Sequence, residues 1–117
     1  MYAIGIGLWV VVVGYVTLGT NDPARAARFY DELLGLIGAK RLMDYGTFVM
    51  WGTSMDKGCL AITPPHDKKA ATVGNGVMVA LRVDSKALVD AVYKKALELG
   101  GKDEGDRKST RLNSSHR

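Results

Sequence analysis

Few side chains in this 117-residue sequence have the chemistry for catalysis. His66 and Asp67 are adjacent and could act as an acid and base pair, although neighbours in a Pro-rich polar loop are far more often simply solvated. Cys59 is the single cysteine, which excludes an internal disulfide and a cysteine-rich metal site. It stands in an apolar stretch without a basic or histidine neighbour, a setting that favours a buried, unreactive thiol over a nucleophile. These residues predict no catalytic group.

Composition narrows the range of partners. With 47% hydrophobic and 24% charged residues, the chain is typical of one globular domain. The formal net charge is +4, yet residues 107–117 hold four basic side chains and no acid, so the remaining residues balance to zero. We therefore expect no nucleic-acid partner.

The first twenty residues carry no charged side chain. Their apolar run is short for a membrane span, is rich in Val and Gly, and has no basic segment before it. These features favour a buried strand that begins somewhere in residues 8–14, and no membrane partner. A span or signal segment, or an extension outside any domain, are the alternatives.

The elements that would position a site follow from Gly14 onward. Residues 15–19 predict a strand, and Asp22 and Pro23 predict a helix start at the N-cap and first helical position. An apolar face at helical spacing runs to Gly38, which closes the helix, while Asp31 and Glu32 are expected on its solvated side. Its members are Ala26, Phe29, Tyr30, Leu33, Leu34 and Ile37.

Five further elements are predicted. Residues 41–44, 47–51 and 59–63 have the pattern of short strands, and 77–83 that of a fourth. The glycines at 74 and 76 predict a turn before it, too short and wrongly placed for a phosphate loop. Ser85 then caps a second helix that ends at Gly100-Gly101. Its apolar face comprises Val89, Val92, Tyr93 and Ala96.

The chain also repeats itself. An offset of 63 pairs Tyr15 with Met78 and Asp22 with Ser85, and it superposes the two helices. The order is strand, helix and three strands, followed by strand and helix alone. A duplicated unit whose second copy lacks its last three strands is the simplest account.

Two stretches resemble a known family. GYVTLGTNDPARAARFYDELLGLIGAKR (residues 14–41) resembles the first strand and helix of the vicinal oxygen chelate superfamily, which contains glyoxalases, bleomycin-resistance proteins and extradiol dioxygenases. GNGVMVALRVDSKALVDAVYKKALELGGKDEG (residues 74–105) is similar to the start of that family's second module. The resemblance implies an α+β fold of paired βαβββ modules around a small-molecule pocket, with the first module complete and the second reduced to its first strand and helix. The expected organisation is an apolar extension or strand start at 1–13, the first module at 14–64, a linker at 65–76, the incomplete second module at 77–105 and a non-native tail at 106–117.

Family enzymes hold a divalent metal with His, Glu or Gln side chains. The positions of this sequence that match the first and third ligands are Tyr15 and Met78, and neither is a usual ligand for such a metal. Residues 59–63 contain no His, Glu or Asp, and the final acidic ligand would lie in strands that are absent. We therefore expect no metal ligands, no cofactor and no catalytic residues.

Strand alternation predicts a ligand pocket instead. Val16 and Leu18 should face the helix and leave Tyr15 and Thr17 toward the pocket, and the same alternation turns Met78 and Arg82 toward it. If the face with Thr47, Val49 and Trp51 is the concave one, the predicted lining is aromatic and soft, with Arg82 for an anionic substituent. The alternative is that these side chains simply fill the interior of the barrel and contact no ligand. The predicted ligand contacts are Tyr15, Thr17, Trp51, Met78 and Arg82.

Two functions follow. The first is a metal-independent domain that binds a small organic molecule, in a cytoplasmic protein that could form a homodimer. The alternative is a metal-dependent lyase or dioxygenase of the same superfamily whose remaining site is lost by truncation.

The tail has its own resemblance. Residues 106–116 (DRKSTRLNSSH) resemble, position by position, one translated reading frame of a common sequencing adapter. We expect these residues to be non-native, so that His116 is no candidate ligand. Whether residues 1–12 are native is left open.

Overall fold

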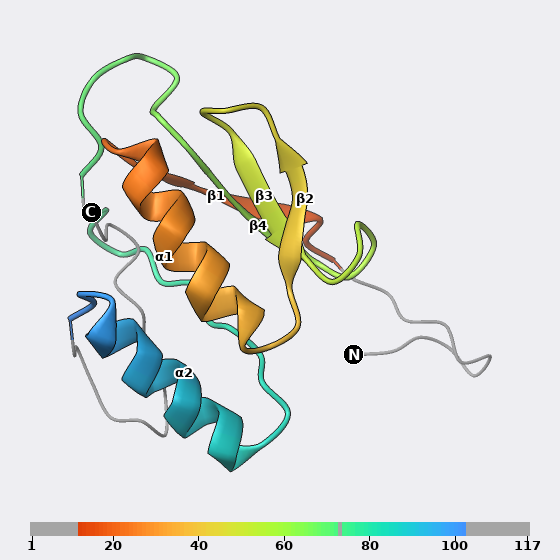
Figure 1. The fold of residues 1–117 in the computed structure, drawn as a ribbon. Coiled ribbons are helices and arrows are strands. Elements are labelled where there is room, and N and C mark those ends of the chain that lie inside the picture. The colour runs from red at the N-terminus through yellow and green to blue at the C-terminus, as the bar shows by residue number, and fades with distance from the viewer. Residues whose placement is uncertain (1–11, 73, 103–117) are drawn as a thin grey trace.

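The protein is described by a computed structural model that covers residues 12–72 and 74–102. The elements are β1 (Tyr15–Gly19), α1 (Pro23–Gly35), β2 (Lys40–Asp44), β3 (Val49–Gly52), β4 (Cys59–Thr63) and α2 (Lys86–Glu98) (Figure 1). This α+β arrangement confirms a complete βαβββ unit followed by the helix of a second unit. Of the predicted extension or strand start at residues 1–13, only Val12 and Val13 are described, and both are exposed and precede β1. Residues 1–11 and the predicted non-native tail at 106–117 lie outside the described residues.

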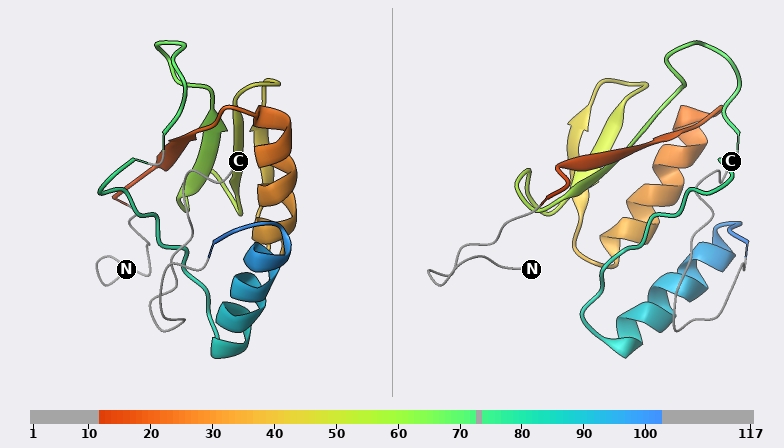
Figure 2. Two further views of the ribbon diagram at one scale, coloured as in Figure 1. Left: turned by 90° about the vertical axis from the view of Figure 1, so that its left-hand side faces the viewer. Right: turned by 180° about the vertical axis from the view of Figure 1, so that it is seen from behind.

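The four strands form one mixed sheet in the order β1-β4-β3-β2. β1 pairs parallel with β4, so that Tyr15 lies beside Cys59 and Thr17 beside Ala61. β4 pairs antiparallel with β3, and β3 antiparallel with β2. α1 connects β1 to β2 and packs on one face of the sheet, which leaves the opposite face without a helix (Figure 2).

α1 begins and ends close to the predicted residues. The Oδ1 atom of Asp22 accepts a hydrogen bond from the Arg25 amide at 3.1 Å, and Pro23 occupies the first turn. Regular helix ends at Gly35, and a tighter turn continues to Gly38, whose φ of +83° favours glycine. The sequence therefore located the helix start correctly and placed its end three residues late.

The core lies between α1 and the sheet. The apolar side of the helix supplies buried residues that meet alternate side chains of β1, β3 and β4. Val92 and Ala96 of α2, which contacts α1, join the same cluster. The buried members are Leu18, Ala26, Ala27, Phe29, Tyr30, Leu33, Leu34, Val49, Trp51, Leu60, Ile62, Val92 and Ala96.

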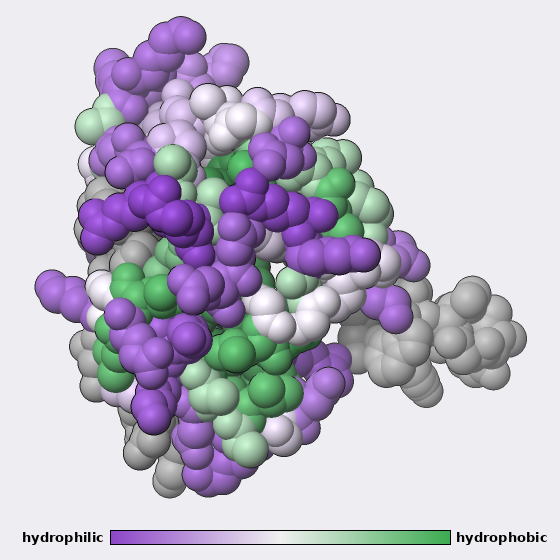
Figure 3. Space-filling view, viewed as in Figure 1, coloured by the Kyte–Doolittle hydropathy of each residue, from purple (hydrophilic) through white to green (hydrophobic). Residues whose placement is uncertain are grey.

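α2 has the predicted caps. The Ser85 hydroxyl accepts a hydrogen bond from the Leu88 amide at 3.1 Å, and the Gly101 amide donates to the Ala96 carbonyl at 2.7 Å after Gly100 turns the chain at a φ of +100°. Apolar surface gathers over the lower part of the molecule, where α2 lies (Figure 3), and Leu97 there is 41% exposed.

The predicted strand at residues 77–83 is wrong. The described residues place no strand there, and the segment crosses below the sheet as coil toward α2 (Figure 1). The predicted alternation of buried and exposed side chains is nevertheless present, because Val79, Leu81 and Val83 pack against the core while Arg82 is exposed. A strand needs a ladder partner, and in the first unit β1 obtains its partner from β4, the last strand. The equivalent partner in the second unit would follow α2, outside the described residues, so the apolar pattern alone does not decide whether a strand forms.

This difference predicts uneven hydrogen exchange. We expect the amides of residues 78–83 to exchange much faster than those of β1 and β4, which lie in a hydrogen-bonded ladder. Amide exchange followed by mass spectrometry on the full chain measures both regions in one sample. Equal protection in the two regions would contradict the expectation.

Candidate functional site

The candidate site is the sheet face opposite α1, called here the free face. Strand pairing assigns residues to it, because partners across the ladder point to the same side. Met50 and Ala61 are paired and buried but lie outside the core cluster under α1, which places them on this side. The ring contact with Tyr15 also places Phe48 on this side. The strand residues of the free face are Tyr15, Thr17, Met43, Met50, Gly52, Cys59 and Ala61.

Three aromatic rings dominate one part of the free face. Tyr15 and Phe48 make an edge-to-face contact with ring centroids 6.4 Å apart, and Tyr45 lies 6.4 Å from Phe48 in a tilted arrangement. β4 lies between β1 and β3. The small side chain of Ala61 on β4 leaves room for Tyr15 and Phe48 to meet across that strand. Tyr15 is 55% exposed and Tyr45 is 73% exposed. Large exposed rings held by a third ring are available for stacking.

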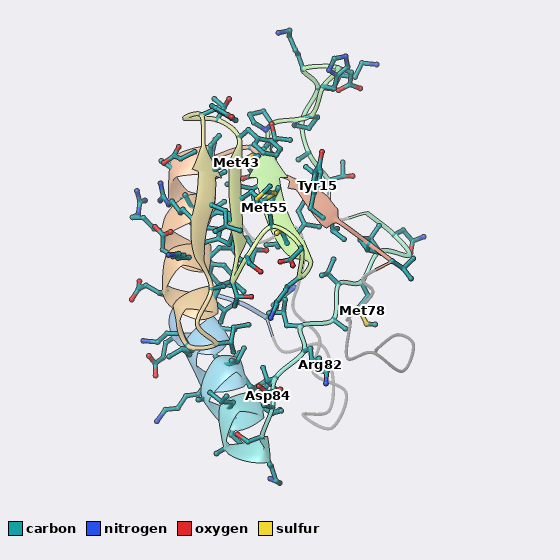
Figure 4. All side chains as sticks on the ribbon, turned by 90° about the vertical axis from the view of Figure 1, so that its right-hand side faces the viewer. Tyr15, Met43, Met55, Met78, Arg82 and Asp84 are labelled. Atoms are coloured by element: carbon teal, nitrogen blue, oxygen red, sulfur yellow. The ribbon has the colours of Figure 1, made fainter. Side chains whose placement is uncertain are left out.

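The structure brings together only some of the predicted ligand contacts. Tyr15 and Thr17 do face away from the helix, as predicted, and Thr17 is exposed beside Tyr15. Met78 and Arg82 are exposed on the coil that leads to α2, well separated from Tyr15 (Figure 4). Sequence reasoning missed Phe48 and Tyr45 as partners of Tyr15, although the alternation of β3 already separated Phe48 from Trp51.

The prediction that Trp51 faces the ligand pocket is wrong. Its side chain is 1% exposed and packs under α1, with its ring 5.6 Å from that of Tyr30. The indole Nε1 donates a hydrogen bond to Oδ1 of Asp31 at 2.9 Å. Both faces of β3 carry large apolar side chains, so alternation alone could not say which face the helix covers. The face with Val49 and Trp51 is the core face, and the predicted Tyr15, Trp51 and Met78 lining does not form.

Asp31 is predicted as a solvated helix residue, but its carboxylate binds side chains from two strands. Its carboxylate accepts hydrogen bonds from Nε and an Nη atom of Arg41 at 2.8 and 2.6 Å, in addition to the bond from Trp51. Arg41 also donates to Asp44 at 2.7 Å, and its guanidinium lies 5.9 Å from the centre of the Trp51 ring. The Arg41 hydrogen bonds lower the pKa of Asp31, against a raising effect of partial burial, and the Trp51 bond lowers it further. The cluster ties α1 to β2 and β3.

We predict that Asp31→Asn costs about 1 kcal/mol of unfolding free energy at pH 7, after allowance for solvent screening. Because the pKa of Asp31 is lowered on folding, its contribution is present above the unfolded pKa of about 3.9 and is lost as the pH falls through the lower folded value. Urea unfolding between pH 2 and 7 should show a shallower acid limb in the variant. Some slope should remain, since the pKa values of Asp44 and Asp56 are lowered too. Glu32→Gln on the same helix is the control, and an identical acid limb in Asp31→Asn and wild type would contradict the prediction.

The other candidate groups have defined local surroundings. Burial, followed by the charge of Asp56, raises the pKa of Cys59, which keeps its thiol protonated and supports the unreactive alternative. The thiol contacts the Ser54 carbonyl oxygen at 3.6 Å. Asp67 accepts a hydrogen bond from the Lys69 amide at 3.0 Å and so organises its own turn in an exposed loop. Burial raises the pKa of Tyr30 to about 12, so this phenol also stays protonated.

No group of three or more His, Cys, Asp or Glu side chains suited to a metal ion occurs within residues 12–72 and 74–102. Within the same part of the chain, no helix combines the length and apolar character required to cross a membrane.

Comparison with known proteins identifies the family. The sequence model of the Glyoxalase/Bleomycin resistance protein/Dioxygenase superfamily matches residues 12–114. The chain belongs to this superfamily. Among solved structures, it is similar to a glyoxalase/bleomycin resistance protein from Albidiferax ferrireducens T118, with 26% sequence identity, a TM-score of 0.73, and coverage of 82% of this chain and 78% of that one. No curated protein matches.

The superfamily assignment confirms the resemblance and the glyoxalase-like fold. The matched range includes most of residues 106–116, and the adapter origin of that stretch stays a prediction.

Proposed function

We propose that this superfamily member is a metal-independent domain that binds a small organic molecule on the free face of its sheet. The observation that carries the proposal is the exposed Tyr15 ring, which Phe48 holds in an edge-to-face contact on the side without a helix. Tyr15 also occupies the strand position that matches the family's first metal ligand, and a phenol is a poor substitute for His or Glu there.

The ligand chemistry follows from the groups available. Tyr15 and Tyr45 offer stacking surface for a flat ring, and Thr17 offers a hydroxyl that donates and accepts. Met78 and Arg82 take no part in this proposal, because they lie on the coil before α2, apart from Tyr15. Trp51 has no part in it, because α1 covers its ring.

The first test uses naphthalene-2-sulfonate, which has a flat ring and one anionic group. We expect saturable binding of this probe to the full chain in isothermal titration calorimetry, and roughly tenfold weaker binding to Tyr15→Ala, since a stacked ring contributes about 1.4 kcal/mol. Leu97→Ala, which removes an exposed apolar side chain from α2, is the matched control and should bind as wild type does. Equal affinity of Tyr15→Ala and Leu97→Ala would overturn the free-face assignment, and Arg82→Ala, which lies apart from Tyr15, serves as a second control for the anionic group.

The competing function is a metal-dependent lyase or dioxygenase, and the superfamily's description names glyoxalase and dioxygenase. That function requires zinc, nickel, manganese or iron in the purified protein and activity with hemithioacetals or catechols that a chelator abolishes. Stoichiometric metal together with such activity would replace our proposal. A cytoplasmic location and a homodimer also remain proposals, and sedimentation of the full chain tests the second.

A further inference from the structure

β1 lies at one margin of the sheet, and its outer edge is open. The strand order β1-β4-β3-β2 gives β1 a single neighbour, so none of the described strands pairs with its other side (Figure 2). Three of its residues, Tyr15, Thr17 and Gly19, are exposed. An open edge of this kind offers its ladder hydrogen bonds to another strand.

The hydrogen bonds to β4 show which backbone groups face outward. The Gly14 carbonyl accepts a hydrogen bond from the Cys59 amide at 3.0 Å, and the Thr20 amide donates to the Thr63 carbonyl at 3.0 Å. Successive residues of a strand direct their backbone groups to opposite edges, so the even-numbered residues from 14 to 20 face β4. The odd-numbered residues of β1 therefore direct their N–H and C=O groups to the open edge.

β1 lacks the features that protect an edge strand from pairing. Its sequence, YVTLG, contains no charged residue and no proline, and its register with β4 is continuous. Directly before the strand, Val12 and Val13 are 89% and 52% exposed. The edge is regular, uncharged and flanked by apolar surface, which favours an uncharged strand as its partner.

The sequence of β1 is complementary to itself in one antiparallel register. A twofold axis at Thr17 sets this residue opposite the partner's Thr17 and sets Tyr15 opposite the partner's Gly19. Within β1, this is the only register in which all three outward residues of each strand enter the ladder. Paired threonines are favourable cross-strand neighbours, and the glycine has no side chain to obstruct the Tyr15 ring. A second copy of β1 therefore meets the requirements of the edge.

We propose that the chain forms a twofold homodimer in which β1 pairs antiparallel with β1 of a second copy, with Thr17 at the axis. The two sheets then continue as one, with both free faces on the same side, and the Tyr15 ring of each copy borders the free face of the other. This interface goes beyond the proposed ligand site, because it assigns a surface and a register to the homodimer and does not depend on ligand binding.

The test measures the oligomeric state of the full chain by sedimentation equilibrium over a range of concentrations. We expect a concentration-dependent dimer in the wild type. Thr17→Lys and Thr17→Glu should each raise the dimer dissociation constant by at least roughly tenfold, because each sets two like charges opposite each other at the axis. An equimolar mixture of the two variants should recover the dimer, since opposite charges then face each other.

Thr47→Lys is the matched control, because it makes the same change at an exposed residue between β2 and β3. It should dimerise as the wild type does. Circular dichroism of each variant checks that the fold is retained, so that a lost dimer is not mistaken for unfolding.

Three results would overturn the interface. A wild-type chain that sediments as a monomer would remove the dimer, including the case in which residues 77–83 of the same chain cover the edge. A dimer that persists in Thr17→Lys would place the contact on another surface. Dimers that are lost in both Thr17 variants and not recovered in their mixture would exclude the register centred on Thr17. Naphthalene-2-sulfonate binding is measured separately, so failure of the interface is distinguishable from failure of the ligand proposal.

Discussion

Trp51→Ala is expected to lower the free energy of unfolding by about 3 to 5 kcal/mol, because it leaves a large cavity beneath α1. The indole fills the space between β3 and the helix, where it packs against Tyr30 and donates its N–H to Asp31. Stabilities of small domains are about 5 to 15 kcal/mol, so this loss removes a large share of the total. Urea unfolding followed by circular dichroism measures it.

Trp51→Phe separates packing from hydrogen bonding. Phenylalanine retains most of the apolar volume but lacks the N–H group, so we expect a loss of about 1 to 2 kcal/mol, reduced by the partial exposure of Asp31. Combining Trp51→Phe with Asp31→Asn should cost less than the sum of the two single changes, since both act on the same hydrogen bond: phenylalanine removes its donor, and asparagine keeps an oxygen acceptor but loses the charge. Strict additivity, or a Trp51→Ala protein as stable as wild type, would show that the indole is not the centre of this core.

Local signals explain which parts of the fold could be predicted. The predicted β1 and β4 ranges match the structure, and the caps Asp22 and Ser85 each bind an amide three residues ahead. Caps, turn glycines and period-two alternation act within a few residues, so the sequence carries them directly. Gly100 belongs to the same class, because its positive φ is a local requirement of the helix end.

The errors concern partners that are distant in sequence. Trp51 was placed on the wrong face because β3 is apolar on both sides, and only its packing against Tyr30, 21 positions earlier, decides between them. Asp31 has the spacing of a solvated helix residue, yet Arg41 and Trp51 reach it from two strands. Residues 77–83 have a strand pattern without a described strand beside them. The period and composition of a segment indicate which of its residues are buried. They do not show which strand it pairs with, because the pairing depends on residues elsewhere in the chain.

The same limit applies to the candidate site. Sequence alternation correctly turned Tyr15 and Thr17 away from the helix. It could not show that Phe48 reaches Tyr15 across the intervening strand, because that contact depends on the strand order β1-β4-β3. It also could not show that Gly52 lies beneath the Cys59 thiol, which follows from the register of β3 and β4.

Gly52→Ala is expected to destabilise the fold by about 1 to 3 kcal/mol through overpacking of the free face. The new Cβ would lie 2.8 Å from Sγ of Cys59 and 3.1 Å from Cδ1 of Leu42, and Gly52 is buried, so one neighbour must move. Its φ is not in the left-handed region, so the cost is steric and not conformational. Urea unfolding of the variant and of Gly35→Ala provides the comparison. Gly35 has nothing within 4 Å of its Cβ position at the end of α1, so alanine there should be neutral or mildly stabilising.

Cys59→Ala identifies the neighbour that the new methyl group meets. Removal of Sγ vacates the space above residue 52, so the double variant Gly52→Ala with Cys59→Ala should be more stable than the sum of the single losses predicts, by about 1 kcal/mol or more. Additive losses would mean that Leu42 carries the strain instead. A Gly52→Ala protein with wild-type stability would show that neither neighbour is displaced by the new methyl group.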